Sequence, residues 1–203
     1  SLRELDVRSN ELTKVGIRHL ANSPHLAHLT TLELSGNAVR CEGTRALAES
    51  PHVGPLHTLD LAGCQIGYDG AQALAGSMNL SCLTSLSLAR NSIGHAGIIA
   101  LARSPHLRQL EHLDVSSNQA YGEPRDEGAV LEAFTGAVFF DHLLTLKCDY
   151  NNMKLSPISS LPKRLRTLEI SLSSLTSAGT VSLIDALNSS TLQRLHLAQN
   201  GID

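Results

Sequence analysis

The sequence predicts an α/β fold: a curved solenoid, or horseshoe, of about eight strand–helix units, the last of them incomplete. Two observations predict this class. One unit recurs at a regular interval along the chain, and within each unit the spacing of apolar residues changes from that of a strand to that of a helix. One unit cannot bury its own apolar face, so neighbouring units must stack. Since strands pack more closely than helices, we expect parallel strands on the concave face and helices on the convex face.

The repeat is clearest at residues 83–109, which read LTSLSLARNSIGHAGIIALARSPHLRQ. The first half of this unit follows the pattern LxxLxLxxNxI. The first leucine of the pattern occurs in eight units, at Leu2, Leu29, Leu56, Leu83, Leu110, Leu143, Leu165 and Leu192. The successive intervals, counted in positions, are 27, 27, 27, 27, 33, 22 and 27, a regularity that predicts one repeat domain over residues 1–203.

Each part of the unit has its own physical basis. Leu59, Asp60 and Leu61 alternate apolar and polar residues, as a short strand does, and residues 70–75 have the spacing of a helix. After the strand the backbone turns inward, where an asparagine side chain can pair with buried N–H and C=O groups. Cys64 and Ser173 replace this asparagine in two units. The asparagines of the other six units are Asn10, Asn37, Asn91, Asn118, Asn151 and Asn200.

Two more positions of the unit carry an expectation. A glycine recurs six residues after the asparagine position, where we expect the helix and strand layers to approach closely. These glycines are Gly16, Gly43, Gly70, Gly97 and Gly179. Thr13 and Thr176 stand where the N-cap of a helix is expected.

The regular pattern breaks at residues 119–164. The loop after Asn118 gains four residues, and the following unit lacks its glycine and contains Pro157 and Pro162, so we expect its helix to be reduced to a turn. Five of the six aromatic residues fall between positions 121 and 150: Tyr121, Phe134, Phe139, Phe140 and Tyr150. Spacing predicts core positions for Phe134 and Phe140, whereas Phe139 and Tyr121 stay undecided. The five aromatic residues could serve to pack the core or to contact a partner, and the sequence leaves both roles open.

Composition narrows the functional classes. The formal net charge is −3, so binding to nucleic acid or to an anionic membrane through bulk charge is not expected. No apolar run is long enough for a transmembrane helix, and no span of a membrane is expected. The four cysteines lack CxxC spacing, which predicts a reducing compartment and hence a cytoplasmic location. The ten histidines show no zinc-type spacing, and no phosphate-loop motif occurs, so we expect neither a metal nor a cofactor.

The pattern LxxLxLxxNxI, followed by a glycine and a helix containing Leu-Ala, resembles that of leucine-rich repeat proteins over essentially the whole chain. The 27-residue length resembles the ribonuclease-inhibitor-like subfamily. The segments ANSPHLAHLTTLELSGN and ARSPHLRQLEHLDVSSN also resemble repeats of large bacterial proteins of planctomycetes and myxobacteria. The resemblance implies a curved solenoid that binds proteins, without implying a particular partner.

Strand alternation predicts which side chains point out of the concave face. The residue between the two strand hydrophobics forms an acidic column in the first units: Asp6, Glu33 and Asp60. Such a column favours a basic partner, although a merely solvated acidic stripe is also open. In later units Lys147 falls between Asp114 and Glu169, which predicts a ladder of ion pairs.

We expect the partner to bind over repeats four to seven, where tyrosine and arginine occur among charged residues, a composition typical of binding hot spots. The candidate partner-binding residues are Arg90, His112, Asp114, Lys147, Asp149, Tyr150, Glu169 and Leu172.

The sequence therefore predicts a non-catalytic protein-binding module. No nucleophile is placed to complete a triad with His112 and Asp114, so we expect no enzyme activity. Two alternatives remain open: a regulator of a small GTPase, acting through Arg90 and suggested by related repeat proteins, and the sensor part of a larger protein. Leu2 lies inside a motif and residues 201–203 stop where a helix should begin, so we also expect a truncated chain or self-association through its ends.

Overall fold

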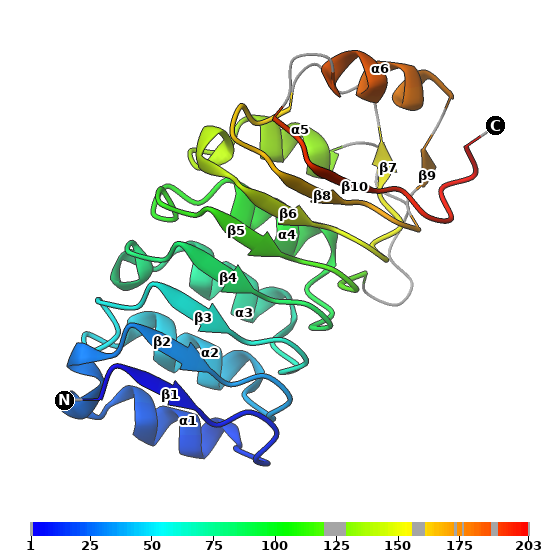
Figure 1. The fold of residues 1–203 in the computed structure, drawn as a ribbon. Helices are drawn as coiled ribbons and strands as arrows, with labels where there is room; N and C mark the ends of the chain where they lie inside the picture. Colours follow the sequence, from blue (N-terminus) through cyan, green and yellow to red (C-terminus); the bar gives the residue numbers. More distant parts are fainter. Residues whose placement is uncertain are drawn as a thin grey trace.

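The computed structural model describes residues 2–119, 129–155, 161–172, 174–175, 177–187 and 191–202. Its main feature is one parallel sheet with strand order β1-β2-β3-β4-β5-β6-β8-β10 (Figure 1). These strands are β1 (Glu4–Asp6), β2 (Thr31–Glu33), β3 (Thr58–Asp60), β4 (Ser85–Ser87), β5 (His112–Asp114), β6 (Thr145–Lys147), β8 (Thr167–Glu169) and β10 (Arg194–His196). Each comes from one sequence repeat, so the predicted α/β solenoid is confirmed.

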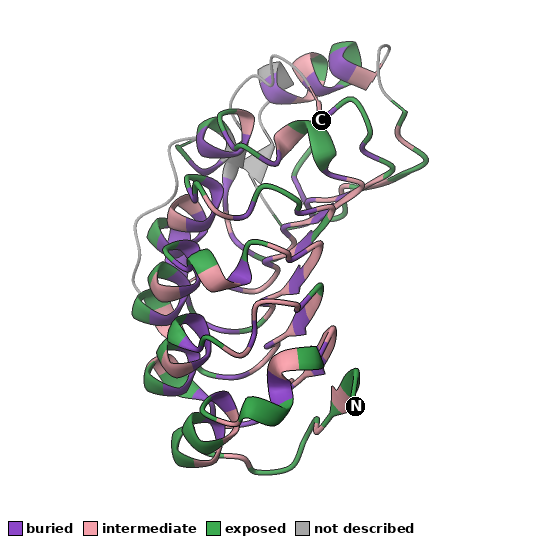
Figure 2. Ribbon diagram, turned by 90° about the vertical axis from the view of Figure 1, so that its left-hand side faces the viewer, coloured by how far each residue is buried: buried purple, intermediate pink, exposed green. Residues whose placement is uncertain are grey.

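Helices cover one face of this sheet. They are α1 (Lys14–Ala21), α2 (Arg40–Glu49), α3 (Gly67–Ala75), α4 (Gly94–Ala102), α5 (Ala129–Thr135) and α6 (Ser177–Leu187). Short 3-10 turns lead back towards the strands: η1 (Pro24–His28), η2 (Met78–Leu80) and η3 (Phe140–His142). Figure 2 shows the helices along the outer edge of an arc and the strands along its inner edge, as the packing of the two layers predicts.

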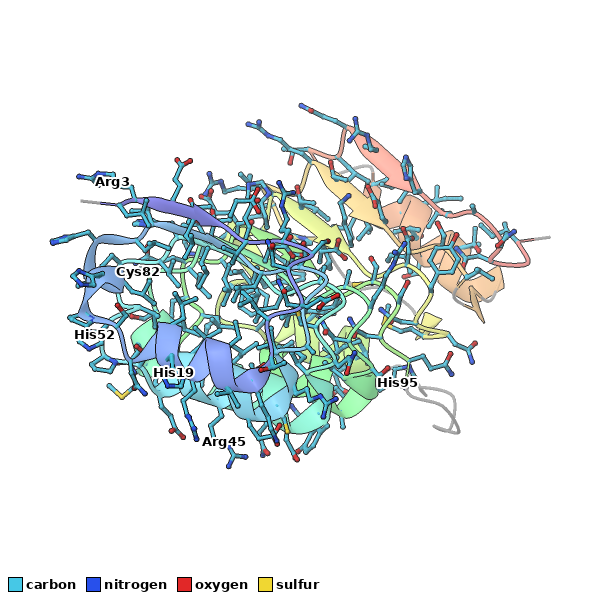
Figure 3. All side chains as sticks on the ribbon, turned by 90° about the horizontal axis from the view of Figure 1, so that it is seen from below. Arg3, His19, Arg45, His52, Cys82 and His95 are labelled. Carbon is cyan, nitrogen blue, oxygen red and sulfur yellow. The ribbon has the colours of Figure 1, made fainter. Side chains whose placement is uncertain are left out.

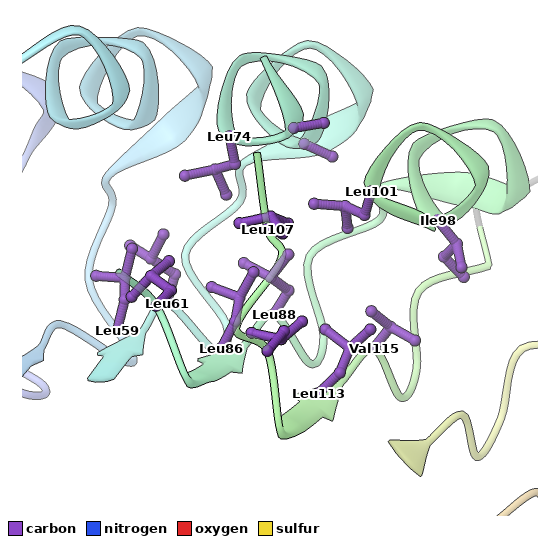
Figure 4. Close-up of a cluster of buried hydrophobic side chains, with 14 of the residues drawn as sticks. Leu59, Leu61, Leu74, Leu86, Leu88, Ile98, Leu101, Leu107, Leu113 and Val115 are labelled. Carbon is purple, nitrogen blue, oxygen red and sulfur yellow. The ribbon is translucent and has the colours of Figure 1, made fainter. Parts of the chain in front are cut away.

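The core is a continuous layer of aliphatic side chains between the sheet and the helices. In Figure 4 strand residues such as Leu86 and Leu88 face helix residues such as Leu74 and Leu101. All four side chains are at most 1% exposed. Burial of each such leucine stabilises the fold by about 2 kcal/mol, and stacked repeats share this layer, as a single repeat cannot.

Strand register is unbroken through the irregular part of the chain. Thr145 of β6 pairs with His112 of β5 on one side and with Thr167 of β8 on the other. The one long and the one short interval between repeats therefore leave the sheet unchanged. The extra and the missing residues are accommodated outside the strands, between the end of one strand and the start of the next.

The asparagine position forms a hydrogen-bonded ladder inside the turn after each strand. Asn118 is fully buried, and its Nδ2 donates to the carbonyl oxygens of Leu88 (2.8 Å) and Val115 (2.9 Å). Its Oδ1 accepts from the backbone N–H of Asn91 (2.9 Å). Buried main-chain groups of two repeats are thereby satisfied, as the sequence predicts.

Two members of this position differ from the others. Asn10 is exposed, because no repeat precedes it in the described chain. Cys64 is buried, and its thiol donates to the carbonyl oxygen of Leu34 at 3.3 Å. Burial raises the pKa of the Cys64 thiol, which keeps it protonated as a donor. Ser173 lies outside the described residues.

The prediction that the recurring glycines lie where the helix and strand layers approach closely is wrong. A Cβ on Gly70 would lie 2.9 Å from Cβ of Ile66 and 3.4 Å from Cβ of Thr44, which belongs to the preceding helix α2. Gly43 meets Ile17 of α1 in the same way, at 3.3 Å. The close approach is therefore to the N-cap residue of the same helix and to the preceding helix, not between helix and strand layers. Gly179 has no described environment of this kind.

The expected N-caps are only partly supported. Thr13 occupies the N-cap of α1 with an extended backbone, but its side chain makes no capping hydrogen bond. Thr176 lies outside the described residues. The helix start is instead held by neighbours: Lys14 pairs with Glu42 of α2, and α1 packs against that helix.

The sixth repeat carries a strand where other repeats carry a helix. β7 (Lys154–Leu155) pairs in parallel with β9 (Ser174–Leu175) of the seventh repeat, behind the main sheet (Figure 1). Within the described residues of this repeat there is no helix, in agreement with the expected reduction. Residues 156–160, which include Pro157, lie outside the described residues.

The aromatic residues of the irregular region divide between core and surface. Phe134 and Phe139 are buried, at 2% and 0% exposed, so packing accounts for both. The prediction for Phe140 is wrong in part: it is only half-buried, because η3 begins there and turns Phe139 inward instead. Tyr150 is 55% exposed on the concave side, and Tyr121 lies outside the described residues.

Candidate partner-binding face

The residues between the strand hydrophobics form one row across the sheet. Register pairs Asp6 with Glu33, Glu33 with Asp60, and Asp60 with Ser87. The row continues through Asp114, Lys147, Glu169 and His196. Side chains project from both layers of the solenoid in Figure 3, with Arg3 on the strand side and His19 and Arg45 on the helix side.

The acidic column is largely engaged within the protein. Arg8 Nη2 lies 2.8 Å from the Asp6 carboxylate, and Arg8 Nε lies 3.0 Å from Glu33. The hydrogen bonds from Arg8 lower the pKa of Asp6. Asp60 accepts the backbone N–H of Ala62 at 2.9 Å, so it caps the turn that follows its strand. These roles give the column a structural basis that needs no partner.

Farther along the face lies an open depression of about 500 Å³, which we call the central hollow. Many of the residues that line it are small, and four of the candidate residues, Arg90, Asp114, Asp149 and Tyr150, line it as well. The complete lining is Ser35, Gly36, Ala62, Gly63, Ser87, Ala89, Arg90, Asp114, Ser116, Ser117, Asp149 and Tyr150. The structure thus brings together residues from distant positions in the sequence, from Arg90 to Tyr150.

The two largest side chains of the central hollow share one unusual backbone position. The residue before the asparagine position is left-handed in every repeat, with φ of 58° at Arg90 and 59° at Tyr150. The first three repeats place a small residue there: Ser9, Gly36 and Gly63. A side chain larger than glycine costs roughly 1–2 kcal/mol in this conformation. Large side chains are therefore held out over the concave face at strained positions.

Strain at these positions is offset by the sheet. The backbone N–H of Arg90 donates to the carbonyl of Ser116, and that of Tyr150 to the carbonyl of Ser171, each at 2.9 Å. These bonds continue the strand ladder beyond the strands themselves. Leu172 has the same left-handed conformation (φ 50°) and is 39% exposed, but it does not line the central hollow.

Each carboxylate of the central hollow accepts a backbone hydrogen bond through one oxygen, Oδ1, and its other oxygen accepts none from the described residues. Asp114 Oδ1 accepts the backbone N–H of Ser116 at 2.9 Å. Asp149 Oδ1 accepts the backbone N–H of Ser171 in the next repeat. Within the described part of the chain, neither carboxylate makes an ion pair. Both acids therefore keep their charge available at the hollow.

The predicted ladder of ion pairs is found on one side only. Lys147 Nζ lies 3.3 Å from Glu169, whose side chain is 12% exposed. His196 Nδ1 lies 3.9 Å from the same carboxylate and pairs with it only when the imidazole is protonated. Among the described residues Lys147 makes no ion pair with Asp114, so the ladder runs towards the C-terminal repeats and not back towards the fifth.

His112 lines two smaller hollows of the concave face. One of about 300 Å³, the bridging hollow, lies between Ser85 and Lys147 and shares Ser87 and Asp114 with the central hollow. The other, of about 280 Å³, contains His112 with Arg166 and Arg194. The sequence analysis missed both arginines. Their positions in the repeat could have identified them. Arg194 occupies the same repeat position as His112, and Arg166 occupies the position directly before it.

A buried histidine connects the fourth repeat to the sixth. His95 of α4 is 8% exposed, and its Nε2 lies 2.8 Å from the carbonyl oxygen of Asn151, so this nitrogen carries the hydrogen. The contact supports the turn that presents Tyr150, the neighbour of Asn151. The helix layer and the concave face are therefore mechanically joined at this point.

Two negative findings concern the described residues. No group of three or more histidine, cysteine, aspartate or glutamate side chains among them is arranged to hold a metal ion. None of the helices within the same ranges has the length and apolar character to cross a membrane.

Four segments of the chain match the family model described as Leucine Rich repeat: residues 1–21, 25–48, 55–75 and 79–102. These four segments are leucine-rich repeats. A comparison with curated proteins found no match. The later repeats of the chain continue the same strand register and the same asparagine ladder, through Asn151 and Asn200. Leucine-rich repeats generally mediate protein–protein interaction and are typically non-catalytic.

Proposed function

We propose that this protein is a non-catalytic interaction module that binds a partner protein over the concave face of repeats four to seven. The observation that carries the proposal is the central hollow, which Arg90 and Tyr150 line together with many small residues. Tyrosine and arginine are the side chains most often found at the energetic centre of protein interfaces. In this protein both stand at left-handed backbone positions where glycine would cost less.

Charge defines the kind of partner surface that fits. The central hollow contains two carboxylates, Asp114 and Asp149, and one guanidinium, Arg90. In the described structure Arg90 makes no side-chain hydrogen bond or ion pair. The balance favours a partner segment with a net positive charge, whose cation can lie against the face of Tyr150 and between the acids.

A matched pair of tyrosine variants tests the proposal. Tyr150→Ala removes the exposed ring of the concave face, and Tyr68→Ala removes a ring of similar exposure (43% against 55%) from helix α3. Partners would be captured by crosslinking from a lysate of the source organism, purified, and titrated against each variant. We expect Tyr150→Ala to weaken binding by about 2 kcal/mol and Tyr68→Ala to leave it unchanged. A partner that loses affinity only with Tyr68→Ala would place the binding surface on the helix side and refute the proposal.

Finer assignments rest on the repeat and on the cysteines. We infer the ribonuclease-inhibitor-like subfamily from the 27-residue interval, and a bacterial origin from the SPH-containing segments. A reducing compartment, such as the cytoplasm, fits four cysteines that are all free, two of them buried in the core. Mass spectrometry of the protein isolated from its source under thiol-blocking conditions would test the last point, since a recovered disulfide would contradict it.

A further inference from the structure

The smallest of the three concave hollows has a different chemistry from the others. Four neighbouring strands contribute one register row to it: His112, Thr145, Thr167 and Arg194. Arg166 and Gln193, each directly before a strand, complete its polar lining around Leu144. No aspartate or glutamate is among its lining residues in the described chain. We call it the cationic hollow.

Its two guanidinium groups are without partners in the described structure. Neither Arg166 nor Arg194 makes a side-chain hydrogen bond or ion pair with any described residue, and both are exposed. Their backbone groups are already used in the sheet: Arg194 N–H donates to the carbonyl of Arg166 at 2.9 Å. Two arginines that share one small hollow repel each other unless an anion lies between them.

Two carboxylates near the cationic hollow, Glu111 and Glu169, are paired elsewhere, whereas Asp114 lines the neighbouring bridging hollow and not this one. Glu111 lies directly before β5, as Arg166 lies directly before β8. Its carboxylate is 3.8 Å from Nη1 of Arg164, which neutralises its charge. Glu169 lies on the same sheet two residues along from Thr167 and is paired with Lys147. The cationic hollow therefore keeps a net positive charge, although the whole chain has a net charge of −3.

The lining favours an oxyanion with several acceptor oxygens. A guanidinium presents a planar fork of N–H donors that matches phosphate, and two such forks can hold one phosphate group. The Thr145 and Thr167 hydroxyls, which make no other side-chain hydrogen bond in the described chain, supply further donors. A phosphate monoester carries a charge of about −1.5 to −2 at neutral pH, more than a carboxylate does.

We propose that the cationic hollow binds a phosphorylated serine or threonine side chain of a partner protein. A protein source is favoured because the hollow belongs to the concave face: it shares His112 and Thr145 with the bridging hollow, which shares Ser87 and Asp114 with the central hollow. A nucleic acid or a membrane surface is disfavoured, because the acidic column of the same face would repel an extended polyanion. The protein source rests on the function proposed above, whereas the anion site itself does not.

The first experiment is a titration of the full chain with a small probe. N-acetyl-phosphoserine amide would be compared with its unphosphorylated form, with inorganic phosphate and with acetate, using chemical-shift changes of the Thr145 and Thr167 amides and calorimetry. We expect the phosphorylated probe and inorganic phosphate to bind at this hollow, and acetate to bind at least about tenfold more weakly. Equal binding of acetate would overturn the assignment to phosphate.

Two pairs of arginine variants separate this site from general charge effects. Arg166→Gln with Arg194→Gln removes both guanidinium groups of the hollow. The matched control, Arg45→Gln with Arg103→Gln, removes the same charge from exposed positions on the helix side. Circular dichroism would verify that both proteins fold. We expect the first pair to weaken binding of the phosphorylated probe by about tenfold or more and the control pair to change it less than about twofold. Similar losses in both pairs, or no loss in the first, would overturn the proposal.

The source of the phosphate is tested with larger ligands. A library of phosphoserine and phosphothreonine peptides, vesicles containing anionic phospholipid, and a single-stranded RNA would each be titrated against wild type and the Arg166→Gln, Arg194→Gln protein. Tighter, arginine-dependent binding of a peptide than of vesicles or RNA supports the proposal, and the reverse order overturns it. Tyr150→Ala should leave binding of the small phosphorylated probe unchanged, so failure here and failure of the central hollow as a partner site are distinguishable.

Discussion

The first four repeats and the following three solve the same packing problem in different ways. In repeats one to four each strand is followed by a helix of 8 to 10 residues, and adjacent helices pack from α1 to α4. In repeats five and six the spacing is irregular, and in the sixth strand β7 lies where a helix would be expected. The sheet nevertheless continues through both regions without a change of register.

The difference shows that the strand side and the helix side of the solenoid are constrained to unequal degrees. On the strand side the repeats are tied to their neighbours by main-chain hydrogen bonds and by the asparagine ladder. On the helix side only apolar burial is required, and β7 with β9, or Phe139, can supply it as a helix does. Large concave residues such as Tyr150 also occur in the irregular half, and the surface where we place the partner extends from Arg90 of the fourth repeat into this half.

The largest expected effect tests whether the ladder is equally important in both regions. Asn91→Ala in the regular half and Asn151→Ala in the irregular half each remove at least two donated hydrogen bonds and at least one accepted one. We expect each to lower the free energy of unfolding by about 3–5 kcal/mol, because buried backbone groups lose their partners. Urea unfolding would measure both.

Asn10→Ala is the control for this pair, since Asn10 is exposed and donates only to the carbonyl of Arg8 in its own repeat. Its expected cost is under about 1 kcal/mol. If Asn151→Ala lowered the free energy of unfolding as little as Asn10→Ala, the sheet of the irregular half would not depend on the asparagine ladder. The strand side would then not be the more constrained side in that half.

A smaller effect is expected from the glycines between helices. Gly70→Ala would place a Cβ 2.9 Å from that of Ile66 and 3.4 Å from that of Thr44, so we expect a loss of about 1–3 kcal/mol. Gly16→Ala meets only Leu12, at 3.5 Å, and should stabilise α1 by up to about 1 kcal/mol through helix propensity. Thermal unfolding would measure the change in melting temperature. A decrease for Gly70→Ala and an increase for Gly16→Ala would support the contact between helices, and changes of the same sign would contradict it.

Two buried thiols report separately on the two regions. Cys64 belongs to the third repeat and Cys148 to the sixth, and burial raises the pKa of both, so each reacts only after local opening. In a protein with Cys41→Ser and Cys82→Ser, we expect Cys148 to react with a thiol reagent about threefold or more faster than Cys64, because β7 covers less of its repeat than a helix covers elsewhere. Mass spectrometry at timed intervals would show the order, and faster labelling of Cys64 would reverse the ranking of the two regions.

The smallest expected effect is a titration on the helix surface of the regular half. A hydrogen bond from Lys14 lowers the pKa of Glu42 from its ordinary value to about 2. Because the folded pKa lies below the unfolded one, the pair stabilises the fold above about pH 4.5 and loses this contribution as the pH falls towards 2. Lys14→Ala should return the pKa of Glu42 towards its ordinary value, as carbon-detected NMR would show, with little change in stability since the pair is exposed. An unchanged pKa would mean that Lys14 is not its cause.

The sequence by itself determined the solenoid, because the repeat period, the strand alternation and the asparagine position are local patterns whose physical requirements are the same in every unit. It also predicted the loss of the helix in the sixth repeat from a short interval that contains Pro157 and Pro162. Arg90, Asp114, Asp149 and Tyr150 were named as candidate partner-binding residues of the concave face, and the structure places them around one hollow.

Only the tertiary structure decided how side chains from distant positions meet. Register brings Arg166 and Arg194 into one hollow, although they belong to different repeats, and sequence reasoning assigned them no role. Which of Phe139 and Phe140 points inward depended on where the turn η3 begins, and the partner of Gly70 depended on the spacing of neighbouring helices. The physical reason is common to all three. A repeat period specifies what each unit must bury, whereas the contacts between units depend on backbone dihedrals and on packing, which only the assembled stack determines.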